Sequence, residues 1–306
     1  HSNNTLTPLT LWRAGKSLMQ AIDQFKPDLV SCHSTIAGLV GRLTLKGRTP
    51  TIFTAHGWGF SPGIPRLRRS LVAMAERLTA PHAKHVICVS RYDRQLALNN
   101  GVGVQEQRLA IHNGVETIES LPSKPHELVE AIFVGRLVNQ KDPLLLIQAI
   151  AELAEDTRTK LHLTIIGDGP LEKPARELIS KHGLKNTISI SPRLDRRDLF
   201  KKYSSSDLFL LISNWEGFPR SILEAMAHGL PVIATDVGGS AEAVDDNTGL
   251  LVPRGNKSAL TQALKRMIND PALRTQMGAA GRAKAQGEFS LKKMCEQTHE
   301  VYKQLV

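Results

Sequence analysis

One segment, centred on Pro219, constrains the fold of this chain more than any other. Asp207–Ser213 and Pro231–Thr235 are short apolar runs, which is typical of buried strands. Between them, Pro219 suits the first turn of a helix, because its missing N–H has no partner to lose there. Gly229 followed by a proline is a helix stop signal. The order strand, loop, helix, strand predicts a βαβ unit of a parallel sheet.

The loop and helix start of this unit form a candidate binding site. Ligands of open α/β sheets bind at the carboxyl ends of strands, and a helix N-terminus offers free N–H groups and partial positive charge to phosphate. Glu216 lies in the loop and Glu224 about a turn and a half into the helix, and carboxylates accept hydrogen bonds from hydroxyls. The expected backbone donors are Gly217, Phe218, Arg220 and Ser221. A site that binds phosphate in its middle and hydroxyls at both ends suits a sugar nucleotide, which has a diphosphate between two sugars.

This run of residues resembles a known family. Glu216 and Glu224 have seven residues between them and are followed by Gly229–Ser240 and Thr248–Pro253. Together these resemble the retaining glycosyltransferases of family 4, most specifically over Gly135–Pro253. The resemblance implies an α/β protein of the GT-B fold, with two Rossmann-like parallel-sheet domains facing a cleft. It also implies a catalytic Glu216 that binds the donor sugar and a Glu224 that binds the ribose. Two isolated glutamates would instead be ordinary helix-start and solvated charges.

Basic residues follow other strands of the same half. Gly135 and Arg136 end one strand, and Lys141 precedes a helix. A pyrophosphate needs cations at fixed positions, and the resemblance implies that Arg136 and Lys141 contact it. By the same resemblance, Arg193 lies near the nucleobase. His56, after a strand of the first half, lies beside the donor sugar as a second catalytic residue.

The net charge and the aromatic content limit the classes of molecule that this protein is expected to bind. The 306 residues carry a net charge of +10, which fits anionic substrates, anionic lipid or nucleic acid, or a merely basic surface. Aromatic residues make up 5%, and neither zinc spacing nor an RNA-binding aromatic pair occurs, so nucleic acid is the least supported partner. Helix Pro65–Thr79 combines arginines with an apolar face, so it is either a lipid-contacting helix or an ordinary one with a basic solvent face. The three cysteines are sparse, and Cys32 and Cys88, which fall in predicted strands, are interpreted as core residues in a reducing compartment.

The chain restarts its strand–helix pattern once, which predicts two domains. We expect residues 1–120 to form an acceptor-side domain, 121–290 a nucleotide-sugar domain and 291–306 a helix that returns to the first domain, with a linker at Glu116–Leu128. By comparison with the family, the first strand and its Gly-rich loop are absent, so the first domain is expected to be truncated. Neither a signal peptide nor a membrane-length apolar run is recognisable.

The prediction is a metal-independent glycosyltransferase that uses no cofactor. It would move a hexose from a UDP- or GDP-linked donor to a glycan or lipid-linked acceptor with retention, in polysaccharide or glycolipid synthesis. The expected location is the cytoplasm, with peripheral contact at the inner face of the membrane. Alternatives are a sugar-nucleotide epimerase of the same fold, a glycosidase, whose carboxylates the helix start would separate awkwardly, and a non-catalytic nucleotide-binding fragment.

Overall fold

A computed structural model describes residues 7–118 and 128–306, which fall into two compact units. Unit 1 comprises His1–His112 and Met294–Val306, and unit 2 comprises Asn113–Lys293. Most of the expected linker, at 119–127, lies outside the described residues. Within the described ranges, no helix combines the length and the apolarity that crossing a bilayer requires.

Unit 1 is built on a parallel sheet of four strands in the order β1-β2-β3-β4. The strands are β1 (Val30–His33), β2 (Thr51–Ala55), β3 (His85–Cys88) and β4 (Arg108–Ala110). The helices are α1 (Pro8–Phe25), α2 (Thr35–Leu45), α3 (Arg66–Thr79), α4 (Arg91–Asn99) and two 3₁₀ turns, η1 (Ala80–His82) and η2 (Gln105–Gln107). Phe53, Trp58 and Phe60 fill the core on one side of this sheet, together with the buried Cys32 and Cys88.

The end of the chain completes unit 1. Helix α13 (Leu291–Lys303) places Val301 against a second core cluster of Ile52, Ile87 and Ile111. In the same helix, the Tyr302 hydroxyl donates to Ser31 Oγ on β1 at 2.8 Å. Unit 1 is therefore assembled from two segments that lie far apart in the sequence.

Unit 2 contains a parallel sheet of six strands in the order β10-β9-β8-β5-β6-β7. The strands are β5 (Val129–Val134), β6 (Leu161–Ile166), β7 (Ile188–Ser191), β8 (Leu208–Leu211), β9 (Val232–Thr235) and β10 (Gly249–Val252). Their order reverses between β5 and β8, which pair directly. Ligands of doubly wound sheets bind outside the carboxyl ends of the strands at such a reversal. The strand order thus indicates that the loops after β5 and β8 form the ligand-binding site.

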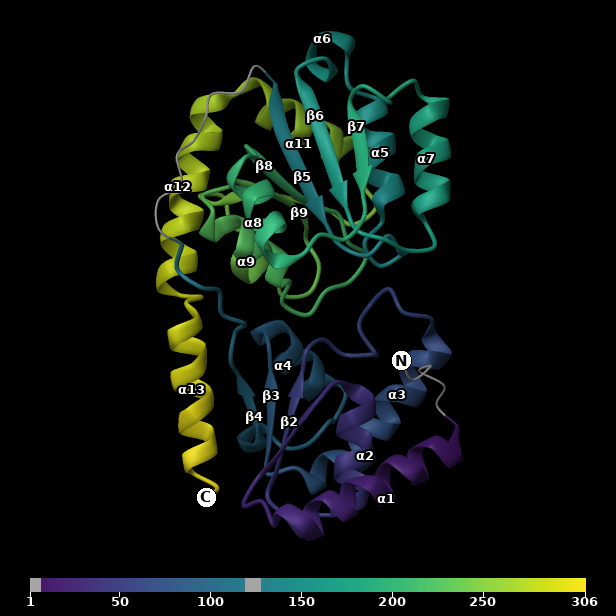
Figure 1. Ribbon diagram of the computed structural model, residues 1–306, viewed down its shortest axis with the longest axis vertical. Coiled ribbons are helices and arrows are strands. Elements are labelled where there is room, and N and C mark those ends of the chain that lie inside the picture. Colours follow the sequence, from purple (N-terminus) through teal and green to yellow (C-terminus); the bar gives the residue numbers. More distant parts are fainter. Residues whose placement is uncertain (1–6, 119–127) are drawn as a thin grey trace. The chain divides into compact units, whose positions relative to one another are not determined.

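Helices flank this sheet (Figure 1). They are α5 (Pro143–Ala151), α6 (Glu155–Arg158), α7 (Glu172–Lys181), α8 (Arg196–Ser204), α9 (Arg220–Ala227), α10 (Ser240–Ala243), α11 (Lys257–Asn269) and α12 (Pro271–Gly287). Helix α9 buries Ile222, Leu223 and Met226, and it packs on α12. The strand–loop–helix–strand order around Pro219 and the helix expected at Pro65–Thr79 are confirmed with shifted ends. The sequence did not predict β10, α6, α10 or α12.

Candidate functional site

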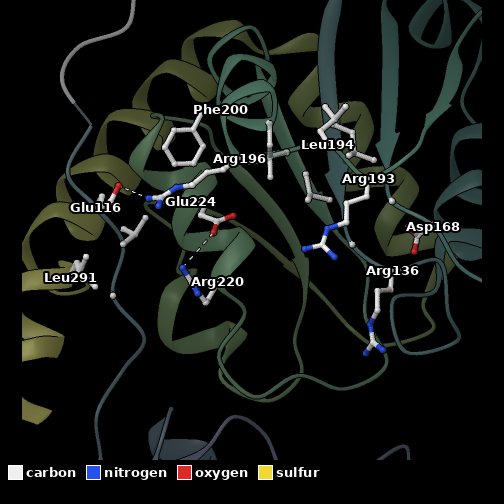
Figure 2. A pocket seen from close by; sticks show the side chains of 17 residues that line it. Glu116, Arg136, Asp168, Arg193, Leu194, Arg196, Phe200, Arg220, Glu224 and Leu291 are labelled. Atoms are coloured by element: carbon white, nitrogen blue, oxygen red, sulfur yellow. Dashed lines mark hydrogen bonds and ion pairs between the residues drawn. The ribbon is translucent and has the colours of Figure 1, made fainter. Parts of the chain in front are cut away.

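A cavity of about 550 Å³ opens at the strand reversal of unit 2, and Figure 2 shows the side chains around it. Its lining comes from the carboxyl ends of β5 and β6, the residues after β7, and helices α8 and α9. Glycines at the ends of β5 and β6 let the two backbones approach closely beneath the cavity. At Gly167, φ is +148° and a Cβ would lie 2.0 Å from the Gly135 carbonyl oxygen, so only glycine allows these two strand ends to approach.

Four arginines surround the cavity: Arg136, Arg193, Arg196 and Arg220. Arg196 pairs with Glu116, since Nη2 lies 2.5 Å from Glu116 Oε2, and its guanidinium lies 5.3 Å from the centre of the Phe200 ring. Within residues 7–118 and 128–306, the Arg136 side chain has one hydrogen bond, a long one of 3.4 Å to Gln140 Oε1. The cavity is therefore lined with positive charge, which suits an anionic ligand.

Glu224 of α9 is one of three acidic residues that line the cavity, with Glu116 and Asp168 (Figure 2). Tyr203 Oη donates to its Oε2 at 3.3 Å, and Arg220 Nη2 lies 4.0 Å from its Oε1. Burial raises the pKa of Glu224, and the nearby Arg220, the Tyr203 hydroxyl and Arg196 only partly offset that effect. Its carboxylate is partly buried rather than a solvated helix charge.

Glu216 and Lys141 meet across the strand reversal. Lys141 Nζ donates to Glu216 Oε1 at 2.5 Å, and their side chains are 15% and 7% exposed. The aliphatic part of Lys141 lies beside Gly135, where a Cβ would come 3.5 Å from Cγ and Cδ. Two residues that the sequence predicts to bind different parts of one ligand are thus direct partners.

The Glu216 loop is fixed on two sides. Asn214 N donates to Gln140 O at 2.7 Å, and Gln140 Nε2 donates to Trp215 O at 3.0 Å. On the other side, Gly238 has a φ of +58°, and a Cβ there would lie 2.0 Å from Glu216 O. The loop therefore carries its carboxylate on a backbone held by both neighbouring strand ends.

The structure brings most predicted site residues together. Five of them line the cavity: Gly135, Arg136, Arg193, Arg220 and Glu224. Lys141 and Glu216 pair beside them, and Gly217 and Ser221 follow on the same loop and helix. The Phe218 ring is instead buried against Phe289, with 5.2 Å between ring centres, so its side chain is part of the core.

His56 belongs to unit 1, where it follows β2. Its Nε2 lies 3.0 Å from Nδ1 of His33, which ends β1, and the two rings stack. His33 Nε2 lies 3.2 Å from Ser31 Oγ. One imidazole nitrogen donates in this contact and the other accepts, so the tautomers of the two histidines are coupled.

Sequence reasoning missed several groups of the site, namely Glu116, Asp168, Leu194, Arg196, Phe200 and Leu291. Arg196 and Phe200 are four residues apart in α8 and so share one face of the helix, a spacing that the sequence itself contains. Glu116 had been assigned to the linker. Only tertiary structure brings it to Arg196, eighty positions away.

Comparison with known proteins agrees with this geometry. The family described as "Glycosyl transferases group 1" matches residues 116–284, more than half of the chain, and "Glycosyltransferase Family 4" matches 3–119. A curated relative from Escherichia coli, UDP-Gal:alpha-D-GlcNAc-diphosphoundecaprenol alpha-1,3-galactosyltransferase, is 27% identical over 95% of this chain and 79% of its own length.

Two solved structures share the fold. Sucrose-phosphate synthase from Thermosynechococcus elongatus superposes with a TM-score of 0.88 at 24% identity, covering 100% of this chain and 80% of its own. HepE from Anabaena in complex with UDP-glucose gives a TM-score of 0.83 at 22% identity, covering 95% of this chain and 82% of its own. With two parallel α/β sheets and a family match across the cavity of unit 2, the chain belongs to the group 1 glycosyltransferases and is a hexosyltransferase-type enzyme of the GT-B fold.

Proposed function

We propose that the enzyme transfers a hexose, with retention and without a metal ion, from a UDP- or GDP-linked donor to a hydroxyl of a glycan or lipid-linked acceptor. The observation that carries this proposal is the cavity at the strand reversal of unit 2, with Arg136, Arg193 and Arg220 around it and the Lys141–Glu216 pair beside it. The neighbour in complex with UDP-glucose and the relative named for UDP-Gal support a nucleotide-sugar donor.

The proposed chemistry balances without a cofactor. The bond between the anomeric carbon and the donor phosphate breaks, the acceptor oxygen attacks the same face, and its proton goes to the departing phosphate oxygen. Arg136, Lys141 and the N–H groups at the start of α9 would stabilise the diphosphate as its charge develops. Glu216 would accept hydrogen bonds from the sugar and Glu224 from the ribose, while Arg193 would lie near the base and His56 beside the sugar.

Calorimetric titration with UDP and GDP in EDTA, followed by assay of a donor panel with and without EDTA, tests this function. We expect one nucleotide to bind and its hexose conjugate to be consumed. The anomeric proton coupling of the product then reports retention. Nucleotide binding with no turnover of any donor would favour the non-catalytic alternative, and loss of turnover in EDTA would refute metal independence.

Replacing Lys141 by Ala is expected to weaken nucleoside diphosphate binding roughly tenfold to a hundredfold. A hydrogen bond between charged groups contributes about 1.5–3 kcal/mol, and Lys141 is the least exposed of the proposed phosphate-binding cations. Titration calorimetry with UDP and GDP measures the effect, with the exposed Lys181→Ala as control. Unchanged affinity would remove Lys141 from the diphosphate site.

Donor affinity is expected to fall on acidification because of Glu224. Its raised pKa means that the folded protein takes up this proton at a higher pH than an ordinary glutamate does, and a protonated carboxyl is a poorer acceptor for the ribose. The weakening should therefore begin above the usual glutamate range. In Glu224→Gln this component should disappear, whereas the titration of the nucleotide itself is common to both proteins. Identical pH profiles of the dissociation constant would contradict the assignment.

We further propose that the enzyme works in the cytoplasm, at the anionic inner face of the membrane. On α3, the apolar face of Leu67, Leu71, Met74 and Leu78 is between 54% and 76% exposed, although such a face normally packs inward. Residues 1–112 carry fourteen Lys and Arg but only five Asp and Glu. Exposed apolar side chains among arginines suit anionic lipid, and the E. coli relative is named for a diphosphoundecaprenol-linked acceptor.

Flotation with phosphatidylglycerol-containing vesicles at low salt is expected to carry the protein upward, and high salt should release it. Leu71→Asp should reduce flotation, because it places a negative charge in the exposed apolar face of α3. Val104→Asp, at an exposed position outside that helix, should not. Protein that stays at the bottom of the low-salt gradient would exclude the membrane contact.

A further inference from the structure

Beneath the Lys141–Glu216 pair lies a buried pair of hydroxyls that the proposed function does not use. Ser213 follows β8 and Thr235 ends β9, and each is 1% exposed. Thr235 Oγ1 accepts from Ser213 N at 2.8 Å and donates to Ser213 O at 2.7 Å. The Ser213 backbone is therefore held from the neighbouring strand by two hydrogen bonds to one hydroxyl.

The side chain of Ser213, whose backbone is held in this way, in turn binds the carboxylate of Glu216. Its Oγ donates to Glu216 Oε1 at 2.6 Å, and Lys141 Nζ donates to the same oxygen. A hydroxyl has one proton to donate, so the proton of Ser213 is committed to this contact. Among the described residues, Glu216 Oε2 receives no hydrogen bond, which leaves one carboxylate oxygen for a ligand.

We propose that Ser213, fixed by Thr235, is the positioning residue that orients Glu216 towards the donor sugar. The ammonium group of Lys141 has three N–H bonds and can turn to a diphosphate, so its hold on Glu216 weakens when a donor arrives. Ser213 has no such competitor, since it is buried and its single proton is already given to Glu216. The contact that keeps the carboxylate in one rotamer through the reaction is thus the hydroxyl and not the ion pair.

This inference rests on the proposed function, because it assumes that Glu216 binds the sugar. A positioning role predicts a particular pattern of effects. Affinity for UDP or GDP, which contain no hexose, should be unaffected by loss of the hydroxyl. Transfer of the hexose should fall, because well-placed groups gain most of their effect from orientation.

The test compares Ser213→Ala with the wild type in two assays, calorimetric binding of UDP and GDP and turnover of the donor that the wild type consumes fastest. We expect Ser213→Ala to lower kcat at least tenfold while the nucleotide dissociation constant stays within twofold. Thr235→Val should have a similar but smaller effect, and Thr235→Ser, which keeps the hydroxyl, should restore activity. The matched control is Ser205→Ala, which removes an exposed hydroxyl that donates to the Lys202 carbonyl.

A double-mutant cycle separates positioning from a general loss of structure. In a Glu216→Gln background, Ser213→Ala should cost little further activity, because residues that act as one unit are non-additive. Full activity of Ser213→Ala, equal losses of nucleotide affinity and turnover, or an additive cycle would each overturn the proposal. A wild type that binds neither nucleotide refutes the donor site itself and, with it, the positioning role.

Discussion

Replacing Glu216 by Gln is expected to lower sugar transfer on the order of 10²–10³-fold, comparable to the loss of a transition-state-stabilising group in other enzymes. The substitution keeps the shape of the side chain but removes the charge that Lys141 and Ser213 both contact at Oε1. It also leaves Lys141 without its counter-ion. Affinity for UDP or GDP is therefore expected to hold or rise while turnover collapses.

Steady-state kinetics with the preferred donor, alongside calorimetry with its nucleotide, distinguishes these effects. Glu177→Gln is the matched control, because Glu177 is an exposed glutamate on α7 of the same unit. A fall in nucleotide affinity that parallels the fall in turnover would assign Glu216 to the architecture of the loop. Near-normal turnover would remove it from catalysis.

The largest stability effect is expected in unit 1, from Arg42→Met. Arg42 Nη2 lies 2.6 Å from Glu76 Oε2, both side chains are 0% exposed, and the guanidinium lies 4.2 Å from the centre of the Phe53 ring. Removing one partner of a buried ion pair leaves an uncompensated charge and typically costs about 3–5 kcal/mol. We expect a loss of that order in the free energy of unfolding of unit 1.

The pH dependence of this loss has a definite sign. Burial raises the pKa of Glu76 even with Arg42 present, and without Arg42 the pKa should rise further. Above the raised pKa that Glu76 has in the wild type, the folded variant still holds a proton that the folded wild type has released. The stability deficit of the variant should therefore grow as the pH rises through that pKa, which lies above the ordinary glutamate range, and should be smaller at lower pH. The double variant Arg42→Met/Glu76→Leu should recover most of the stability, because neither buried charge remains.

Urea unfolding followed by tryptophan fluorescence measures this effect in a Trp215→Phe background. The remaining tryptophans, Trp12 and Trp58, both belong to unit 1. Exposed Arg48→Met serves as the control within the same unit. A single variant as stable as the wild type, or a double variant no better than the single, would contradict the account.

Where apolar runs dominate the sequence, the fold could be predicted. The runs that became β8 and β9 are buried throughout, because strands in the middle of a parallel sheet are covered on both faces. Helix α12 escaped prediction for the opposite reason. It approaches α9 through small residues, and a Cβ at Gly278 would lie 2.1 Å from Gly229 O, so the packed face lacks a stripe of large side chains.

Part of the candidate site could be predicted from the sequence and part could not. The strand-to-helix loops were visible, since strand ends, glycines and charges recur there in the sequence. The side-chain pairs of the site could not be predicted, because contacts such as Lys141–Glu216 and Arg196–Glu116 join residues that are 75 and 80 positions apart in the sequence. The sequence also did not predict that the apolar face of α3 is exposed. An amphipathic pattern shows that a helix has two faces, but it does not show which face packs against the protein.

Unit 1 has a consequence for how the protein is made. Its sheet emerges from the ribosome with residues 1–112, but Val301 and Tyr302, which pack against Ile52, Ile87 and Ile111 and bind Ser31, are synthesised almost two hundred residues later. Throughout that interval the apolar side of the nascent sheet lacks its covering helix, while unit 2 is contiguous and can close as soon as it is translated. Premature termination near residue 290 would therefore spare the unit just completed and leave the unit made first without its cover.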